Sequence, residues 1–147
     1  MTETDNQSGE TTLEPEITHR EPICDLGQVE AIYLKIVEAS PDAKIVINED
    51  GRVIVFNVQA ELMFGYDRQE VLGQEIEMLI PNQLREKHID HRTGFFNAPG
   101  TREMGTGQVL EGLHRNGTNF QIQIKLAPMV IPKTGVHVLA VVRRVKN

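Results

Sequence analysis

The pattern of apolar residues changes abruptly near residue 28. Before it, polar and acidic residues dominate, and such a segment buries too little apolar surface to offset the entropy lost on ordering. We therefore expect residues 1–25 to be a disordered acidic tail. After it, apolar residues recur at the i, i+3, i+4, i+7 and i+8 spacing that marks one face of an α-helix: Val29, Ile32, Tyr33, Ile36 and Val37. This spacing predicts a helix over residues 28–39, ended by the constraint that Pro41 places on its predecessor.

Two pairs of apolar, β-branched runs predict hairpins. KIVIN and RVIVFN are separated by a turn at Glu49-Asp50-Gly51, and QVLEGLHR and TNFQIQIKLAPM by Asn116-Gly117, a strong two-residue turn signal. The run VHVLAVVRRV predicts one more strand at the end. The late strands are locally connected, so the five strands should form an antiparallel sheet.

Short helices are expected between the two groups of strands. QAELMFG can be capped by Gly65, and DRQEVLG has Asp67 at its N-cap position. Pro81 is expected to start a longer helix over residues 82–97, and NAPGTREMGTG reads as a loop. The predicted fold class is α+β: a five-stranded antiparallel sheet with short helices on one face and an N-terminal amphipathic helix, in a single domain over residues 26–147.

Charge and composition exclude several classes of protein. The net charge of the 147 residues is −6, and −5 of it lies in residues 1–22. The nearly neutral remainder has no basic patch, so we expect no nucleic-acid binding. No basic and apolar leader and no apolar run of about 20 residues is present, which argues against a signal peptide and a membrane span and for a cytoplasmic protein. The single cysteine, Cys24, excludes a disulfide framework and a cysteine-rich zinc site.

Enzymatic activity is not expected. The sequence has no nucleophile elbow, phosphate-binding loop or metalloprotease helix. The chain ends directly after the last predicted strand. Either it passes a signal to a separate effector protein, or it is an excised sensor whose effector has been removed.

Three segments, in this order, resemble the PAS domain family: NEDGRVIVFN, QAELMFGYDRQEVLGQEIEMLIP and HRNGTNFQIQIKLAPM. The resemblance covers residues from about 28 to 145. It implies a sheet cupped around small helices, with a ligand pocket between the sheet and the longest helix. It also implies a role in sensing a small molecule, light, redox state or gas, or in dimerisation alone.

The run LIPNQLREKH is similar to the axial-histidine region of haem-binding PAS oxygen sensors. The resemblance implies that His88 is a haem-iron ligand, and a neutral imidazole in an apolar pocket suits that role. Two positions depart from those sensors: Gln108 stands where they often have arginine, and Thr106 where some have methionine, with Met104 two residues away. His88 as a structural or surface helix residue is the alternative. Haem b is the sharpest cofactor candidate, and non-covalent FAD is a weaker one without positive support.

The predicted pocket lies between the long helix and the sheet, with Met104 and Gln108 as further candidates for contact with the cofactor. Its expected lining residues are Phe95, Phe96, Ile122, Ile124, Leu126 and the last strand. His91, three residues after His88, reads as part of a helix-surface pair rather than a metal site. Arg92, Arg102 and Glu103 are expected to fix the glycine-rich loop, or to contact an anionic group of a ligand. His114 and His137 are expected at the sheet surface.

Two functions remain open from the sequence. The first is a sensory module that binds a small ligand or cofactor and signals through dimer or partner contacts. The second is a ligand-free adaptor whose pocket is filled by its own side chains. Either would dimerise through residues 26–39 and the exposed face of the sheet. Leu34 lies off the main apolar stripe, so it is either a scattered surface residue or part of a second, dimer-forming face.

Overall fold

The computed structural model describes residues 26–100, 102–104 and 110–146. Side chains are described for these residues except 26, 27 and 102–104. The predicted acidic tail, Cys24, Thr106 and Gln108 therefore lie outside the described residues, as does the side chain of Met104. The chain separates into two units, Met1–Leu34 and Lys35–Asn147, and the second contains the whole sheet. Within the described ranges, no helix is long and apolar enough to cross a membrane.

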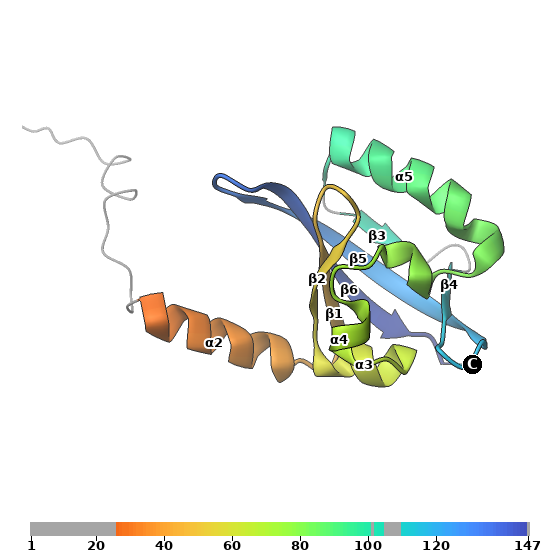
Figure 1. Cartoon of the computed structure of the whole chain (residues 1–147), viewed down its shortest axis with the longest axis horizontal. Helices are drawn as coiled ribbons and strands as arrows, with labels where there is room; N and C mark the ends of the chain where they lie inside the picture. The colour runs from red at the N-terminus through yellow and green to blue at the C-terminus, as the bar shows by residue number, and fades with distance from the viewer. Residues whose placement is uncertain (1–25, 101, 105–109, 147) are drawn as a thin grey trace, which may run out of the picture. The chain divides into compact units, whose positions relative to one another are not determined.

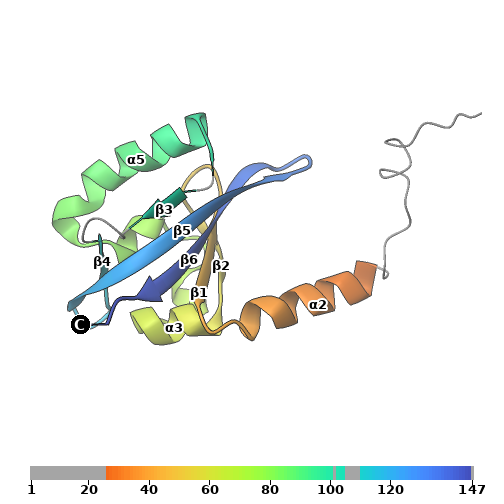
Figure 2. The same ribbon diagram turned by 180° about the vertical axis from the view of Figure 1, so that it is seen from behind.

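An antiparallel sheet forms the body of the second unit (Figures 1 and 2). β1 (Ala43–Ile47) and β2 (Val53–Phe56) form the first predicted hairpin, and β4 (Leu110–Leu113) and β5 (Asn119–Ile131) form the second. The last strand, β6 (Gly135–Arg144), lies between β1 and β5. The first and last parts of the domain thus meet at the centre of the sheet.

One strand was missed in the sequence. Within the segment predicted to be a loop, β3 (Arg102–Met104) pairs with Ile124–Leu126 of β5. The next part of β5, Asn119–Ile122, pairs with β4. Because β3 and β4 follow each other along the same edge of β5, the sheet remains five strands wide. Three residues between prolines and glycines are too few for a recognisable alternation, so the contact with β5 decides the conformation.

The helices agree with the prediction in type and differ at their ends. The first, α2 (Leu26–Glu38), precedes the sheet, and α3 (Val58–Phe64) and α4 (Arg68–Val71) follow β2. α3 ends at Gly65, whose φ of 82° is the left-handed conformation that glycine adopts at little cost. Asp67 occupies the N-cap position of α4, but its side chain makes no capping hydrogen bond.

The longest predicted helix starts later than expected. Two 3-10 turns, η1 (Ile76–Leu79) and η2 (Asn82–Leu84), come first, and α5 (Arg85–Asn97) follows them. The predicted helix over 82–97 is therefore wrong in its first turn. Pro81 is buried and extended, with φ −54° and ψ 143°, and it fixes the direction in which the chain approaches α5.

The core lies between one face of the sheet and the short helices. Phe64 of α3 is at its centre, with ring centroids 6.3 Å from Phe56 and 5.3 Å from Phe120. Val71 and Leu79 are buried in the same cluster. The sheet positions of the cluster alternate on β1 (Ala43 and Ile45) and on β5 (Phe120 and Ile122), as predicted for a sheet with one covered face. On β2 the buried residues Val53 and Phe56 are three apart, because the pairing of β2 with β1 contains a register shift.

Two histidines differ from their predicted surface positions. His137 is only 6% exposed; it lies on β6 directly opposite Met129 of β5, and its Nδ1 is 3.2 Å from the carbonyl oxygen of Gly135. His114 follows the end of β4 and is half-buried. Its ring packs so closely on Gly65 that a Cβ atom there would lie 2.4 Å from a ring carbon. Both histidines therefore pack against other residues of the domain.

Asn57 joins three segments at the end of the first hairpin. It is 1% exposed, and its Oδ1 accepts hydrogen bonds from the backbone N–H groups of Lys44 and Ala60 at 2.9 and 3.0 Å. Its Nδ2 donates to the carbonyl oxygens of Val37 and Asp42 at 2.8 and 3.1 Å. One amide thus caps α3 and holds the C-terminal turn of α2 beside β1.

We expect replacement of Asn57 to destabilise the domain strongly. Asn57→Ala should lower the free energy of unfolding by about 3 kcal/mol, because it removes a helix cap and leaves buried backbone groups without partners. Asn57→Asp should cost at least as much, since a carboxylate oxygen would face two carbonyl oxygens. Urea unfolding measures both, with the exposed Asn97→Ala as control. A near-neutral Asn57→Asp would contradict the donor role of Nδ2.

Candidate functional site

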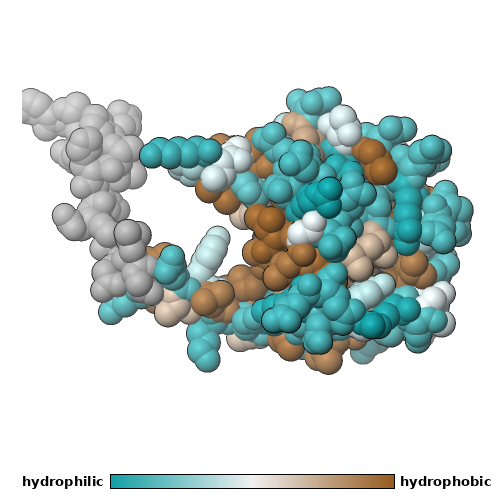
Figure 3. All heavy atoms as spheres, viewed as in Figure 1, coloured by the Kyte–Doolittle hydropathy of each residue, from teal (hydrophilic) through white to brown (hydrophobic). Residues whose placement is uncertain are grey.

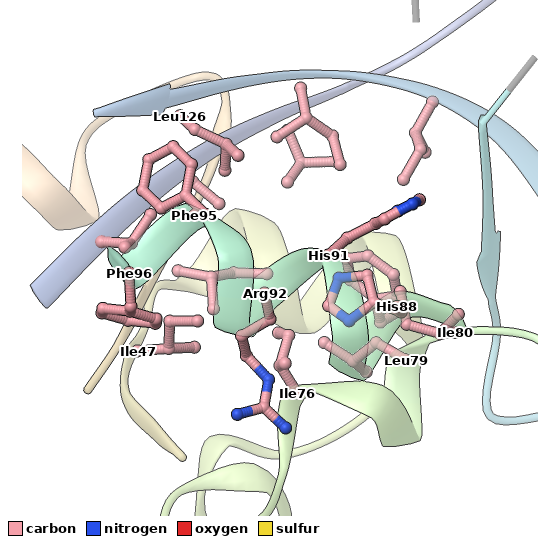
Figure 4. A pocket seen from close by; sticks show the side chains of 17 residues that line it. Ile47, Ile76, Leu79, Ile80, His88, His91, Arg92, Phe95, Phe96 and Leu126 are labelled. Carbon is pink, nitrogen blue, oxygen red and sulfur yellow. The ribbon is translucent and has the colours of Figure 1, made fainter. Parts of the chain in front are cut away.

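A cavity of about 390 Å³ lies between α5 and the covered face of the sheet (Figure 4). This volume is within the usual range for small-molecule sites. The structure brings the predicted residues Phe95, Phe96, Ile122, Ile124 and Leu126 together around it. Its other lining residues come from β1, α3, η1 and the residue after it, α5 and β6: Ile45, Ile47, Phe64, Ile76, Leu79, Ile80, His88, His91, Arg92, Val138, Ala140 and Val142.

The sheet wall of the cavity follows from strand alternation. Ile122, Ile124 and Leu126 are two residues apart on β5, so they project from the same face. The positions opposite them on β6 are Arg144, Val142 and Ala140. This wall is largely apolar.

The polar residues of the cavity come from α5. His88 and Arg92 are four residues apart, and His91 and Phe95 are likewise, so these residues share one side of the helix. Phe95 is the buried residue of α5, and its ring makes an edge-on contact with Phe96, with centroids 6.3 Å apart. Arg85 donates from Nε to the carbonyl oxygen of Ile80 at 2.8 Å and so fixes the start of the helix.

Glu77 of η1 is the centre of a buried polar cluster. Its Oε2 lies 2.6 Å from His88 Nδ1 and 2.9 Å from Arg92 Nε, and its Oε1 accepts from Arg92 Nη2 at 3.0 Å. The carboxyl side chain is 5% exposed and that of Arg92 10%, whereas that of His88 is 33% exposed. Figure 4 shows His88 and Arg92 on neighbouring turns of α5, with the guanidinium directed away from the His88 ring.

Two opposing effects set the pKa of Glu77. Burial raises the pKa, and the hydrogen bonds from Arg92 and His88 lower it; the hydrogen bonds prevail, so the pKa lies below the ordinary value of 4.5. Glu77 is therefore ionised at neutral pH. Its negative charge is balanced within the cluster by the bidentate guanidinium of Arg92.

The two ring nitrogens of His88 have different surroundings. Nδ1 is occupied by Glu77, so Nε2 is the nitrogen that remains for a molecule in the cavity. Metal-bound histidines in proteins usually bond a carboxylate or carbonyl through their other nitrogen, which orients the ring. The arrangement therefore fits an imidazole that binds a metal centre brought in by a ligand.

A metal ion held by side chains alone is not supported by the described part of the chain. It contains no group of three or more histidine, cysteine, aspartate or glutamate residues that could hold one. His91 is exposed and lines the cavity beside His88. A ligand that brings its own metal would need only one of these histidines.

Arg92 fixes a different part of the structure from the one predicted. It binds a carboxylate, as expected, but that carboxylate belongs to Glu77 of η1 rather than to the glycine-rich loop. Its guanidinium also lies against the turn between β1 and β2: a Cβ atom on Gly51 would be 2.3 Å from Arg92 Cζ. Since Gly51 has φ 76°, its position requires glycine for the backbone as well as for this contact.

Glu77 was missed as a site residue in the sequence. It lies in an apolar run, IEMLIP, where an acidic residue needs a buried partner. The matching signal is the pair of basic side chains at i and i+4 on α5, His88 and Arg92. Together, an isolated acid in an apolar run and two basic residues on one helix face would have indicated the cluster.

We expect Glu77→Gln to lower the free energy of unfolding by about 3 kcal/mol at pH 7, because it leaves the buried Arg92 without its countercharge. Because the folded-state pKa of Glu77 is lowered, its contribution is fully present above pH 4.5 and is lost as the pH falls through the folded pKa. The difference between wild type and variant should therefore shrink on acidification. Urea unfolding at several pH values measures this, with the exposed Glu86→Gln as control. A pH-independent difference would contradict the ionised state of Glu77.

Comparison with known proteins identifies relatives of this chain. Two relatives are the sensor protein FixL of Bradyrhizobium diazoefficiens, 30% identical over 94 residues and 64% of this chain, and the oxygen sensor protein DosP of Escherichia coli, 31% identical over 114 residues and 78% of this chain. The chain spans only 19% and 14% of their lengths.

Solved structures show the same fold. The PAS domain of an HTR-like protein from Haloarcula marismortui superposes with a TM-score of 0.69 at 22% identity, over 82% of this chain and 94% of that one. The model of the PAS fold family matches residues 31–145. The chain belongs to the PAS domain family, and it is homologous to parts of the sensor proteins FixL and DosP.

Proposed function

We propose that this PAS domain binds a small, mainly apolar ligand in the cavity beneath α5 and signals through dimer or partner contacts. The observation that carries the proposal is the cavity itself: about 390 Å³, with aliphatic and aromatic walls and a few polar groups from one helix. Ligand sites commonly have this composition.

The alternative is a ligand-free adaptor whose pocket is filled by its own side chains. A filled pocket would have close-packed walls, as protein interiors do. The cavity instead leaves Ile124, Leu126 and Phe96 only half-buried, although they belong to its wall. This open volume favours the ligand-binding function.

The sharpest form of the proposal is haem b held by the Nε2 atom of His88. The apolar walls suit a porphyrin face, and the bond from Nδ1 to Glu77 suits an axial histidine. In this form His88 would hold the haem iron, which would supply a centre for binding a gas or for a change of redox state, and the apolar strand residues of the cavity would exclude water. The name of one relative, oxygen sensor protein DosP, supports this form.

We expect the purified protein mixed with haemin to give a sharp Soret band that shifts on reduction. His88→Ala should lose the band, because it removes the proposed axial nitrogen. His91→Ala is the matched control, since it removes a neighbouring imidazole from the same cavity, and it should retain the band. Ultraviolet–visible titration measures all three proteins.

A featureless spectrum with no haemin uptake would reject haem. Organic extraction and mass spectrometry would then test the wider ligand-binding proposal, and with it the weaker FAD candidate. A protein that yields no bound molecule would favour the adaptor function.

The proposed dimer contact is helix α2. Its large apolar residues are exposed, from 39% for Val29 to 66% for Leu34, and Figure 3 shows apolar side chains along the surface of the helix. Helices with apolar residues on most sides are usually covered by another element. We propose that a second copy of residues 26–39 covers this one. A separate effector protein would then bind the dimer and respond to its state.

We expect Leu34→Glu to convert dimers into monomers, because it places a charge on the apolar surface of α2. Lys35→Glu is the matched control, since it adds an acidic residue at an exposed neighbouring position, and it should leave the dimer intact. Size-exclusion chromatography with light scattering over a concentration series gives the result. An unchanged mass for Leu34→Glu would refute this contact.

A further inference from the structure

We propose that Glu77 is a positioning residue for His88, which holds the imidazole as the Nδ1–H tautomer and so presents an unprotonated Nε2 to the ligand. The inference rests on the proposed function, because it concerns the same cavity. Beyond the proposed function, Glu77, a buried residue outside the pocket lining, receives a role, and the chemical class of ligand that the pocket prefers is defined.

The geometry of the contact places a proton on one ring nitrogen of His88. The 2.6 Å distance between Glu77 Oε2 and His88 Nδ1 is that of a short, charge-assisted hydrogen bond. Glu77 is in a 3-10 turn and His88 is eleven residues later on α5, so the contact joins two elements. A carboxylate can only accept at this bond, and therefore the proton must be on Nδ1.

The negative charge of Glu77 has a partner other than His88. Arg92 already provides two hydrogen bonds and a full positive charge to Glu77. The buried carboxylate thus already has a cationic partner, and its bond to His88 requires only a proton on Nδ1. A neutral imidazole has one proton. With this proton on Nδ1, Nε2 is left with a lone pair.

The tautomer determines which ligands fit the cavity. His88 is one-third exposed, so water can reach it in the empty cavity; a ligand that covers Nε2 must replace that water with a Lewis-acidic metal or an N–H or O–H donor. A purely hydrocarbon ligand would leave Nε2 unsatisfied. The site therefore selects a ligand that has an apolar body and one electron-pair acceptor.

For haem, the carboxylate has a further consequence. An imidazole that donates to a carboxylate is a more basic ligand than one that donates to a neutral oxygen. A more basic axial ligand stabilises ferric over ferrous iron. Glu77 should therefore lower the reduction potential of the bound haem without touching it.

A purely structural role for Glu77 is the competing explanation. In that case the residue only ties α5 to η1 through Arg92, and the His88 proton would not depend on it. The two roles differ in what they predict for the ring nitrogens. They can be separated in the protein without any ligand.

The first experiment is ¹⁵N–¹H NMR of the histidine rings in the full chain at neutral pH. We expect His88 to be neutral and protonated at Nδ1. The double variant Glu77→Met/Arg92→Met removes the acceptor together with the buried charge that Glu77→Met alone would leave unpaired. In this double variant, most His88 rings should carry the proton on Nε2.

The conservative variant Glu77→Gln should retain the Nδ1–H tautomer, because its amide oxygen still accepts. His91 serves as an internal reference whose tautomer should not change in either variant. A wild-type His88 that is protonated at Nε2, or at both nitrogens, would overturn the proposal. So would an unchanged tautomer in the double variant.

The second experiment uses the haemin-loaded protein. Glu77→Gln should shift the ferric–ferrous equilibrium about tenfold towards ferrous iron, which is about 59 mV for a one-electron couple. The exposed Glu86→Gln should give no shift. A change of less than twofold in Glu77→Gln would contradict the electronic part of the inference.

The two proposals fail in distinguishable ways. Absence of haemin uptake would reject haem as the ligand, while the tautomer of the ligand-free protein would still decide the role of Glu77. Haemin uptake together with an Nε2–H tautomer in the ligand-free protein would retain the proposed function and refute the positioning role.

Discussion

The site depends on the contacts that the buried carboxylate of Glu77 makes with His88 and Arg92. α5 has thirteen residues, and Phe95 is the one that is buried. Apolar packing therefore holds little of the helix, and the cavity lies directly beneath it. The bonds from Glu77 to His88 and Arg92 take the place of that packing. They hold the helix to η1 while the cavity remains between α5 and the sheet, a combination that a close-packed helix could not provide.

The cavity and the N-terminal helix are connected through β1. Ile45 and Ile47 of this strand line the cavity, and the neighbouring Lys44 is bonded through its backbone to Asn57. Asn57 in turn holds the carbonyl oxygen of Val37 in the last turn of α2. Glu38, in the same turn, accepts a hydrogen bond from the backbone N–H of Val58 and forms an ion pair with Arg68. A displacement of β1 by a ligand would thus act directly on the last turn of α2, the helix proposed to form the dimer contact.

The sequence predicts most of the fold because local signals set it. Gly65 and Asn116-Gly117 mark turns whose backbone conformations few other residues adopt, and strand alternation defines the covered face of the sheet. β3 and the late start of α5 were not predictable in this way. The former depends on an edge of β5 and the latter on the buried, extended Pro81, and neither leaves a periodic pattern.

The candidate site was predictable in part. His88 and the apolar wall are on recognisable elements, so spacing and family resemblance place them correctly beside one cavity. Glu77 was missed because a single acidic residue in an apolar run has no partner in the linear pattern. Its partners are eleven and fifteen residues away, and only the folding of η1 against α5 brings them together.

The most direct test of the central claim, that the cavity beneath α5 is a ligand site, is methyl NMR of isoleucine residues during a titration with haemin. The account predicts that the methyl signals of Ile45, Ile47, Ile122 and Ile124 shift or broaden in proportion to bound haemin. The methyls of Ile54 and Ile131, which do not line the cavity, should remain in place. Unchanged signals from the four cavity residues, or changes confined to the other two, would contradict the account.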